Sequence, residues 1–370
     1  MSSKDIPWQV ERKAQFQTGA AFYNPQSRLV RDLGVLAGAV YRQEQGQLRV
    51  LDALAGCGVR SLRYWLESKA DYLWVNEGNP QHHHLIQQNL AAIPPDRYRL
   101  THQDAHRLFF NCYQERDYYD LVDVDCFGSA APYLNTMLWA TKIGGLMYLT
   151  CTDGRTITGH PPEKTVPVYN AIARSHPAIQ EQALRILIGA VQQQAATRGL
   201  GIKPIFAFFT GQTYRVMLRL VAKPQLTSTN YGFLAYCHDC GNYHTFSWRA
   251  LNKVGCSCNQ PAITVSGAMW LGQLHDSQQL GRMITLANQW GWTKVTKLLQ
   301  LMQGELVFPP YYYTLGEIGH RGKLDIPQKA KLIKALQEAG YRAAATHIEP
   351  EAIKTDAKME EVVAIASKVV

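Results

Sequence analysis

Long apolar runs are missing from this chain of 370 residues. No stretch approaches the ~20 consecutive apolar residues that a transmembrane helix needs. The N-terminal segment MSSKDIPWQV has none of the apolar character of a secretory signal peptide. Blocks of like charge, internal repeats and low-complexity segments are absent as well. These absences argue against a membrane protein and a charged tail, and they predict a soluble protein of the cytoplasm.

Charged residues are few, and one sign is in excess. They make up 18% of the chain, and 38 basic against 29 acidic residues leave a formal net charge of +9. A basic balance favours a polyanionic partner such as nucleic acid. The excess is spread over both halves of the chain, so the charge does not locate the surface that such a partner would use.

Cysteine is present but does not follow the spacing of a disulfide framework. Of the eight cysteines, four are isolated and four form a cluster in the second half of the chain: Cys237, Cys240, Cys256 and Cys258. Two close pairs of thiolates suit tetrahedral Zn²⁺ and leave no open coordination position. We therefore expect a structural zinc site. The second pair is CxC where CxxC is usual, so His238 and His244 remain alternative ligands.

Strands alternate with helices through the first part of the chain. LRVLD, DYLWVNE, YRLTHQD, YYDLVDVD and GGLMYLTCTD are each typical of a strand, and a helix is expected from about Gln26 to Tyr41. IKPIFAFFTGQTYRVMLRLVA is typical of an antiparallel hairpin that turns at Thr210-Gly211-Gln212. This order predicts an α/β fold with a mostly parallel, Rossmann-like sheet. The closing hairpin favours the class I methyltransferase form of that sheet.

The pattern changes after Lys223-Pro224. The cysteine cluster, a helical stretch near 276–303 and a helix near 327–339 follow, which together predict a smaller α+β domain. We expect one domain at 1–224 and a second at 225–370. The run Tyr311-Tyr312-Tyr313 could stack on RNA bases or pack within a turn, and the sequence leaves both open.

Polar residues follow the first three strands of the predicted sheet. In such sheets ligands bind beyond the carboxyl ends of the strands. Asp52 leads into a loop with Gly56 and Gly58, which allow the backbone to approach a ligand closely. Glu77 suits ribose hydroxyls, and Asp104 suits an adenine amino group. The loop lacks the third glycine of a dinucleotide fingerprint, so the pattern favours S-adenosylmethionine over NAD.

The fourth strand ends in an acid followed by an aromatic residue, Asp125 and Phe127. Methylation of an exocyclic amine needs a group that accepts an amine hydrogen, because the nitrogen lone pair is delocalised into the ring. It also needs a flat surface that orients the base. Asp125 and Phe127 would supply both, although an aspartate that caps a helix explains the same spacing.

Taken together, these motifs resemble the tRNA guanine-26 N2-dimethyltransferase family over nearly the whole chain. The matching segments are Phe22-Tyr23-Asn24-Pro25 with Arg31-Asp32, Asp52 to Arg63, Asn76-Glu77, Asp104-Ala105, Asp123 to Ser129, Thr150 to Asp153, Thr346-His347 and Ile353 to Ala357. The family usually has proline between the acid and the aromatic residue, where this chain has Cys126. A nucleophilic role for Cys126 is not expected, because direct transfer to an amine needs no covalent enzyme intermediate.

The resemblance implies a role for each residue of the site. Arg31, Asp52, Glu77, Asp104 and Ala105 would line the S-adenosylmethionine site, next to Gly56 and Gly58. Asp125 would accept a hydrogen from the guanine amine, acting as general base, and Phe22 and Phe127 would sandwich the flipped base.

The function implied is methylation of the N2 amine of guanine in tRNA, at position 26, first to the monomethyl and then to the dimethyl product. The C-terminal domain would bind tRNA, and we expect a monomer with no obligate protein partner. Two alternatives remain. One is a methyltransferase for another RNA or DNA amine, and the other is a catalytically inert tRNA-binding module.

Overall fold

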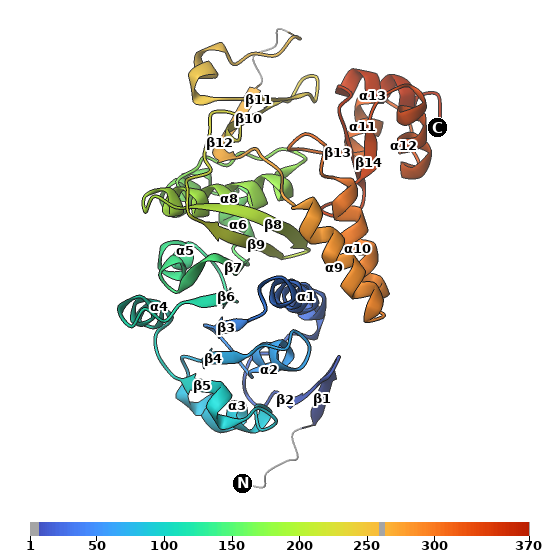
Figure 1. Cartoon of the computed structure of the whole chain (residues 1–370). Helices are drawn as coiled ribbons and strands as arrows, with labels where there is room; N and C mark the ends of the chain where they lie inside the picture. Colours follow the sequence, from blue (N-terminus) through green and yellow to red (C-terminus); the bar gives the residue numbers. More distant parts are fainter. Residues whose placement is uncertain (1–6, 259–262, 370) are drawn as a thin grey trace.

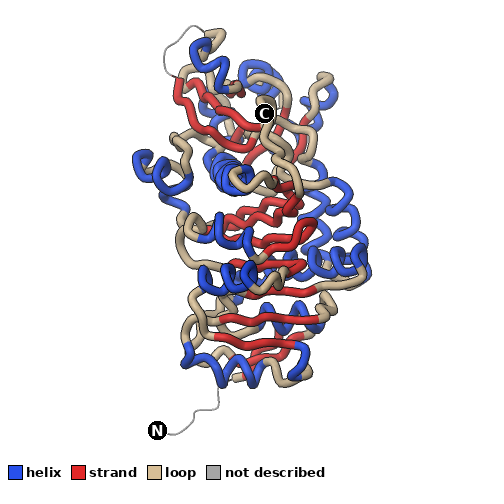
Figure 2. The backbone as a smooth tube through the Cα atoms, turned by 60° about the vertical axis from the view of Figure 1, so that its left-hand side comes forward, coloured by secondary structure: helices blue, strands red, loops and turns tan. Residues whose placement is uncertain are grey.

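A seven-stranded mixed sheet runs through the centre of the computed structural model, which describes residues 7–258 and 263–369 (Figure 1). The strands lie side by side in the order β5 (Tyr98–Thr101), β4 (Tyr72–Asn76), β3 (Arg49–Asp52), β6 (Tyr119–Val124), β7 (Thr141–Cys151), β9 (Thr213–Val221) and β8 (Gly201–Thr210). The first five are parallel, and β9 is antiparallel to both β7 and β8. Figure 2 shows the strands stacked as one ladder. The predicted parallel strands and closing hairpin are therefore confirmed.

Both faces of the sheet are covered, so its central strand β6 is buried along its whole length. All six residues of β6 are buried. Alternate residues of β3 face opposite sides, with Leu51 in one core cluster and Val50 in the other. The helices of the first side are α4 (Ala105–Gln114), α5 (Tyr133–Thr136) and α8 (Ile179–Ala196). Those of the second side are α1 (Arg28–Gln45), α2 (Val59–Leu66) and α3 (His83–Asn89).

The helix expected from Gln26 to Tyr41 is present as α1, which follows a 3-10 turn at Pro25–Ser27. The Asn24 side chain accepts a hydrogen bond from the backbone N–H of Gln26 and so starts the turn. α1 continues to Gln45 and ends at Gly46, whose φ of 78° is left-handed.

The helical stretch expected near 276–303 is present as two helices, α9 (Ser277–Gln289) and α10 (Thr293–Gly304), which separate at Gly291, whose φ is 69°. Between β6 and β7 lie the short α5 and a 3-10 turn at Met137–Trp139. The helix expected near 327–339 is confirmed as α12 (Lys329–Glu338).

Several elements have no counterpart in the sequence prediction. An antiparallel hairpin, β1 (Trp8–Glu11) and β2 (Ala14–Gln17), precedes α1. α6 (Gly154–Ile157) and α7 (Pro162–Tyr169) lie between β7 and α8. The later elements are β10 (Tyr231–Cys237), β11 (Tyr243–Phe246), β12 (Ile263–Trp270), β13 (Tyr313–Thr314), α11 (Leu315–Gly322), β14 (Ala343–Ala345), β15 (Ala352–Thr355) and α13 (Met359–Ala366). They form two further three-stranded sheets with flanking helices.

The C-terminal part packs directly on the central sheet. β12 contacts α8, and α9 and α10 contact α1. β8 is the last strand of the sheet, and two buried histidines cover its open edge: the N–H of Ala207 donates to Nδ1 of His275 at 3.4 Å, and Nε2 of His347 donates to the Ala207 carbonyl at 3.0 Å. Residues on both sides of position 224 thus share one hydrophobic core.

Within the described residues, no helix is both long and apolar enough to cross a membrane.

Candidate active site

The ends of β3, β4 and β6 meet at one edge of the sheet, because these strands are parallel neighbours. The glycine loop after β3 contacts the acid that follows β4: the backbone N–H of Gly56 donates to Oε2 of Glu77 at 2.8 Å. Gly56 and Gly58 have φ values of 57° and 81°, which residues with a Cβ rarely adopt. The structure therefore brings the predicted loop and the predicted ribose acid together.

Asp52 is buried beneath this loop, with 1% of its surface exposed. One carboxylate oxygen accepts a hydrogen bond from the Ser61 hydroxyl at 2.6 Å, while Oδ1 has no hydrogen-bond partner among the described residues. Burial and the neighbouring charge of Asp123 raise the pKa of Asp52 to about 7. An ammonium group beside Oδ1 would satisfy this oxygen and offset its burial. The amino acid part of S-adenosylmethionine offers such a group, so Asp52 fits this cofactor.

Asp104 and Ala105 lie at the start of α4, after β5. Oδ1 of Asp104 accepts hydrogen bonds from the backbone N–H groups of His106 and Arg107, at 2.9 and 3.2 Å. Asp104 is exposed and Ala105 is buried. Asp104 thus acts as a helix cap, and its carboxylate lies at the same strand-end edge as Glu77.

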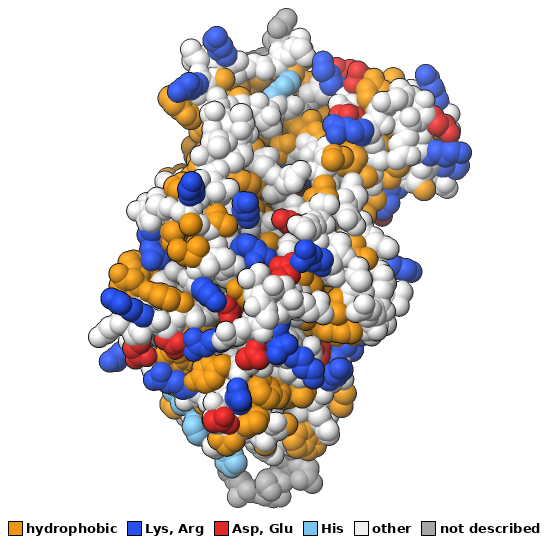
Figure 3. Space-filling view, in the orientation of Figure 1, with side chains coloured by type: hydrophobic (Ala, Val, Ile, Leu, Met, Phe, Trp, Pro, Cys, Tyr) orange, Lys and Arg blue, Asp and Glu red, His pale blue; other side chains and the backbone are white. Residues whose placement is uncertain are grey.

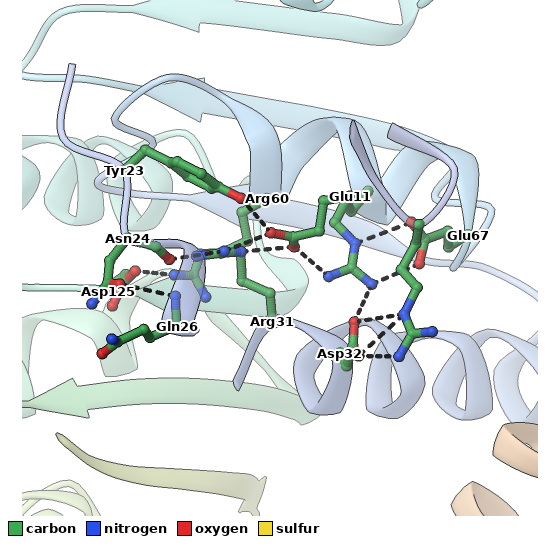
Figure 4. Close-up of polar contacts among 11 residues, drawn as sticks. Glu11, Tyr23, Asn24, Gln26, Arg31, Asp32, Arg60, Glu67 and Asp125 are labelled. Carbon is green, nitrogen blue, oxygen red and sulfur yellow. Dashed lines mark hydrogen bonds and ion pairs between the residues drawn. The ribbon is translucent and has the colours of Figure 1, made fainter. Parts of the chain in front are cut away.

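Arg31 forms an ion pair with Glu11, which was not predicted as a site residue (Figure 4). Its Nε and Nη2 donate to the two carboxylate oxygens of Glu11, at 2.8 and 2.6 Å. Nη2 also donates to the Asn24 carbonyl at 3.1 Å, and the Tyr23 hydroxyl donates to Glu11 at 2.9 Å. The Arg31–Glu11 ion pair holds both Tyr23 and Asn24, so Arg31 anchors the loop that carries Phe22.

Asp125 follows β6 and is partly open, with 30% of its side chain exposed. Arg60 donates to one of its carboxylate oxygens, and Arg215 donates to the other. The Thr150 hydroxyl donates to Oδ1 at 2.7 Å. The carboxylate is therefore held on both oxygens while one side faces solvent. Among the described residues, Asp125 accepts no hydrogen bond from the backbone N–H groups of a helix, so it does not act as a helix cap.

Two large aromatic side chains, Phe22 and Phe127, face solvent. Phe22 is 79% exposed, and Phe127, two residues after Asp125, is 93% exposed. The Phe22 carbonyl lies 3.3 Å from the position that a Cβ on Gly56 would take, so its loop passes directly beside the glycine loop. An exposed aromatic ring can stack on a planar base.

Cys126 lies between Asp125 and Phe127 in the sequence, where the family that the motifs resemble usually has proline. It is buried. Its thiol donates to the Thr150 carbonyl at 3.0 Å, and burial raises its pKa to about 12. A thiol so strongly protonated is a poor nucleophile. This agrees with the expectation that Cys126 forms no covalent intermediate.

The four clustered cysteines converge as their spacing predicts. Their Sγ atoms all lie within 4.8 Å of one another. Cys237 and Cys258 are 3.5 Å apart, and Cys240 and Cys256 are 3.3 Å apart. Four zinc–sulfur bonds of about 2.3 Å in a tetrahedron place neighbouring sulfurs about 3.8 Å apart, so the arrangement fits Zn²⁺. The alternative ligand His238 instead contacts the Thr264 hydroxyl at 3.3 Å.

A second group of potential metal ligands, His275, Glu305 and His347, lies on the edge of β8. Nδ1 of His347 is 2.6 Å from Glu305, and its Nε2 is bonded to Ala207. His275 accepts from the Ala207 N–H through Nδ1, which leaves the proton of the neutral ring on Nε2. Hydrogen bonds therefore use both ring nitrogens of His347, whereas Nε2 of His275 has no hydrogen-bond partner among the described residues.

Arg60 and Arg215 were not predicted as site residues, and neither was Glu11. Arg215 could have been noticed, because it lies within a mostly apolar strand, β9, and the structure buries it to 1% exposure. A buried arginine in a strand needs an acidic partner. Glu11 gives no such indication, since its partner Arg31 is distant in sequence.

Basic side chains are spread over the face seen in Figure 3 and do not form one patch there. Lysines and arginines alternate with acidic residues over much of its length. This agrees with the even spread of charge along the chain.

Comparison with known proteins identifies the family. A family model described as N2,N2-dimethylguanosine tRNA methyltransferase matches residues 6–367. The tRNA (guanine(26)-N(2))-dimethyltransferase of Aeropyrum pernix is 29% identical, over 92% of this chain and 88% of the relative. The enzyme of the same name from Pyrococcus abyssi is also 29% identical, over 94% of this chain and 92% of the relative.

A solved structure extends the similarity to the whole fold. Trm1 from Pyrococcus horikoshii in complex with S-adenosyl-L-methionine aligns with a TM-score of 0.85 and 27% identity, covering 97% of this chain and 99% of that chain. The central sheet is accordingly a Rossmann-like methyltransferase sheet. This chain belongs to the N2,N2-dimethylguanosine tRNA methyltransferase family.

Proposed function

We propose that this protein transfers methyl groups from S-adenosylmethionine to the N2 amine of guanine 26 in tRNA, giving first the monomethyl and then the dimethyl product. The main observation behind this proposal is the Asp125 carboxylate, which is held on both oxygens and is partly open. The exposed ring of Phe127 follows two residues later, and the exposed ring of Phe22 belongs to the loop that contacts Gly56. The family and its relatives of the same name supply the substrate class.

The residues at the strand ends would hold the cofactor. Asp52 would accept from the ammonium group, Glu77 from the ribose hydroxyls and Asp104 from the adenine amino group, with Ala105, Gly56 and Gly58 lining the backbone of the pocket. When bound, S-adenosylmethionine supplies a methyl group that bonds to the amine nitrogen while the electron pair of the broken bond stays on sulfur.

The chain's own residues would orient the base and manage its proton. Phe22 and Phe127 stack on the two faces of a guanine taken out of the helix, and this fixes its plane. Asp125 accepts a hydrogen bond from N2, which directs the nitrogen lone pair towards the methyl group and provides a place for the proton that the amine loses. No covalent link to the protein is required.

The C-terminal half would serve the substrate and the shape of the protein. We propose that Cys237, Cys240, Cys256 and Cys258 bind one structural Zn²⁺ and that residues 225–370 bind tRNA, whereas residues 1–224 bind the cofactor. Four thiolates leave no coordination position for water, so such a site has no hydrolytic role. We expect the protein to act as a cytoplasmic monomer.

Transfer of labelled methyl groups to defined tRNA transcripts tests the proposal. The purified protein is incubated with labelled S-adenosylmethionine and an unmodified transcript, beside a transcript identical except for adenine at position 26. We expect up to two methyl groups per molecule of the first transcript and none on the second. Equal labelling of both transcripts would contradict the assigned position, and labelling of neither would contradict the activity.

A further inference from the structure

Two arginines from different elements hold the Asp125 carboxylate. Arg60 lies on α2 and Arg215 on β9, and each donates through Nη2 to a different carboxylate oxygen. Figure 4 shows Asp125 and Arg60 facing each other. The side chains of Arg60 and Arg215 are 5% and 1% exposed, against 30% for Asp125. Only the acid can therefore meet a substrate.

A second acid lies beneath the two guanidinium groups. Nη1 of Arg60 is 3.5 Å from Asp123, and Nη1 of Arg215 is 3.7 Å from the same carboxylate. The Tyr64 hydroxyl donates to Asp123 at 2.7 Å. Asp123 is completely buried, so it cannot meet the substrate, but it balances one of the two positive charges.

The hydrogen bonds of the arginines point towards Asp125 and not towards Asp123. Nη1 of both arginines, Nε of Arg215 and Oδ1 of Asp123 have no hydrogen-bond partner among the described residues. The contacts with Asp123 are thus electrostatic only, whereas those with Asp125 are directional. Removing Arg60 would free one oxygen of Asp125, whereas removing Arg215 would leave the other oxygen held by the Thr150 hydroxyl alone.

We infer that Arg60 and Arg215 are positioning residues, which fix the Asp125 carboxylate with its open side towards the guanine amine. This inference rests on the proposed function. A carboxylate held on both oxygens accepts the amine hydrogen bond without reorganisation, and the buried arginines act through it.

The kinetics of arginine variants test this role. For Arg215→Met we expect kcat to fall by roughly two orders of magnitude, as misplaced catalytic groups do, while the affinity for S-adenosylmethionine stays close to wild type. Arg215→Lys and Arg60→Lys keep the charge but lose the forked geometry, and we expect them to lose less activity.

Arg219→Met is the matched control, because Arg219 lies on the same strand but donates to the Gly144 carbonyl. We expect its kcat to match wild type. If Arg215→Met does not fold, as judged by thermal melting, the kcat values of the two lysine variants test the role. An active wild type whose arginine variants keep its kcat would overturn the positioning role alone. A wild type that binds S-adenosylmethionine but methylates no guanine would contradict the proposed function itself.

Discussion

Asp125 is the residue through which the protein would act on its substrate, so its replacement should affect the chemical step. We expect Asp125→Asn to lower kcat to below roughly a tenth of wild type, with nearly unchanged affinity for S-adenosylmethionine. Single-turnover methylation of a tRNA transcript and calorimetry with the cofactor measure the two quantities. Asp117→Asn, next to the opposite end of β6, is the control. A variant that keeps most of its turnover would rule out Asp125 as the hydrogen acceptor.

Replacement of Glu77 should instead lower the affinity for S-adenosylmethionine and affect the chemical step less. Hydrogen bonds to a charged group are worth roughly 1.5–3 kcal/mol each, so we expect Glu77→Ala to weaken S-adenosylmethionine binding by at least tenfold, with a smaller effect at saturating cofactor. Titration calorimetry measures this.

Glu77 also accepts a hydrogen bond from the Gly56 N–H, so Glu77→Ala removes a contact with the glycine loop as well as the charged acceptor for the ribose. Glu77→Gln keeps an oxygen for that N–H but loses the charge. We expect its affinity to lie between those of wild type and Glu77→Ala. Unchanged affinity in both variants would assign the ribose to another acid.

Single residues could be predicted from the sequence where they lie at the end of a strand. Asp52 ends β3, Glu77 follows β4 and Asp125 follows β6, and these strand ends come together because the strands are parallel. The ion pair between Arg31 and Glu11 could not be predicted, because it depends on how the short hairpin of β1 and β2 packs. The role of the tyrosine run also becomes clear only from the packing. Tyr312 and Tyr313 are buried, which supports packing within the turn and not stacking on RNA bases.

At the scale of elements, the cysteine cluster ties β10 to the segment that follows β11. Cys237 ends β10, whereas Cys256 and Cys258 come from the loop before β12. We expect purified protein to contain one equivalent of zinc and Cys237→Ser/Cys240→Ser to contain none. The variant should melt at a lower temperature and bind tRNA more weakly, because metal binding stabilises the fold.

Two controls accompany this experiment. Cys112→Ser changes an isolated cysteine of α4, and we expect it to keep the zinc. Binding of S-adenosylmethionine by the double variant should persist, since the cluster lies outside the cofactor edge of the sheet. Metal-free wild type that melts like the double variant would show that these cysteines bind no metal.

Elements that repeat a regular pattern were predictable, and those decided by tertiary contacts were not. The parallel strands and the closing hairpin follow from their apolar runs and the turn at Gly211. α9 and α10 share one apolar pattern, so only the left-handed Gly291 separates them. The segment before β7 forms only the four-residue α5 and a 3-10 turn, a division that its composition does not indicate.

In the whole molecule, Glu305 and His347 connect the C-terminal part to the edge of the sheet. Burial alone would raise the pKa of Glu305, but the charge and hydrogen bond of His347 outweigh it and lower this pKa to about 2. A lowered carboxyl pKa adds stability above its unfolded value, near 4.5, and this stability is lost as the pH falls from there towards 2.

We therefore expect Glu305→Gln to be less stable at pH 7 by about 3–5 kcal/mol, the cost of breaking a buried ion pair. The difference from wild type should shrink as the pH falls below about 4.5. Urea unfolding at several pH values measures it, with the exposed Glu351→Gln as the control. A difference that stays constant over this pH range would show that the ion pair with His347 does not contribute.

The most direct measurement of the central claim is the identity of the methylated atom. After incubation with S-adenosylmethionine and an unmodified tRNA transcript, the RNA is digested to nucleosides and analysed by mass spectrometry against standards. The Asp125 site predicts N2-methylguanosine early in the reaction and N2,N2-dimethylguanosine later, with no other methylated nucleoside. Methyl groups on a ring nitrogen of guanine, or on another base, would contradict it.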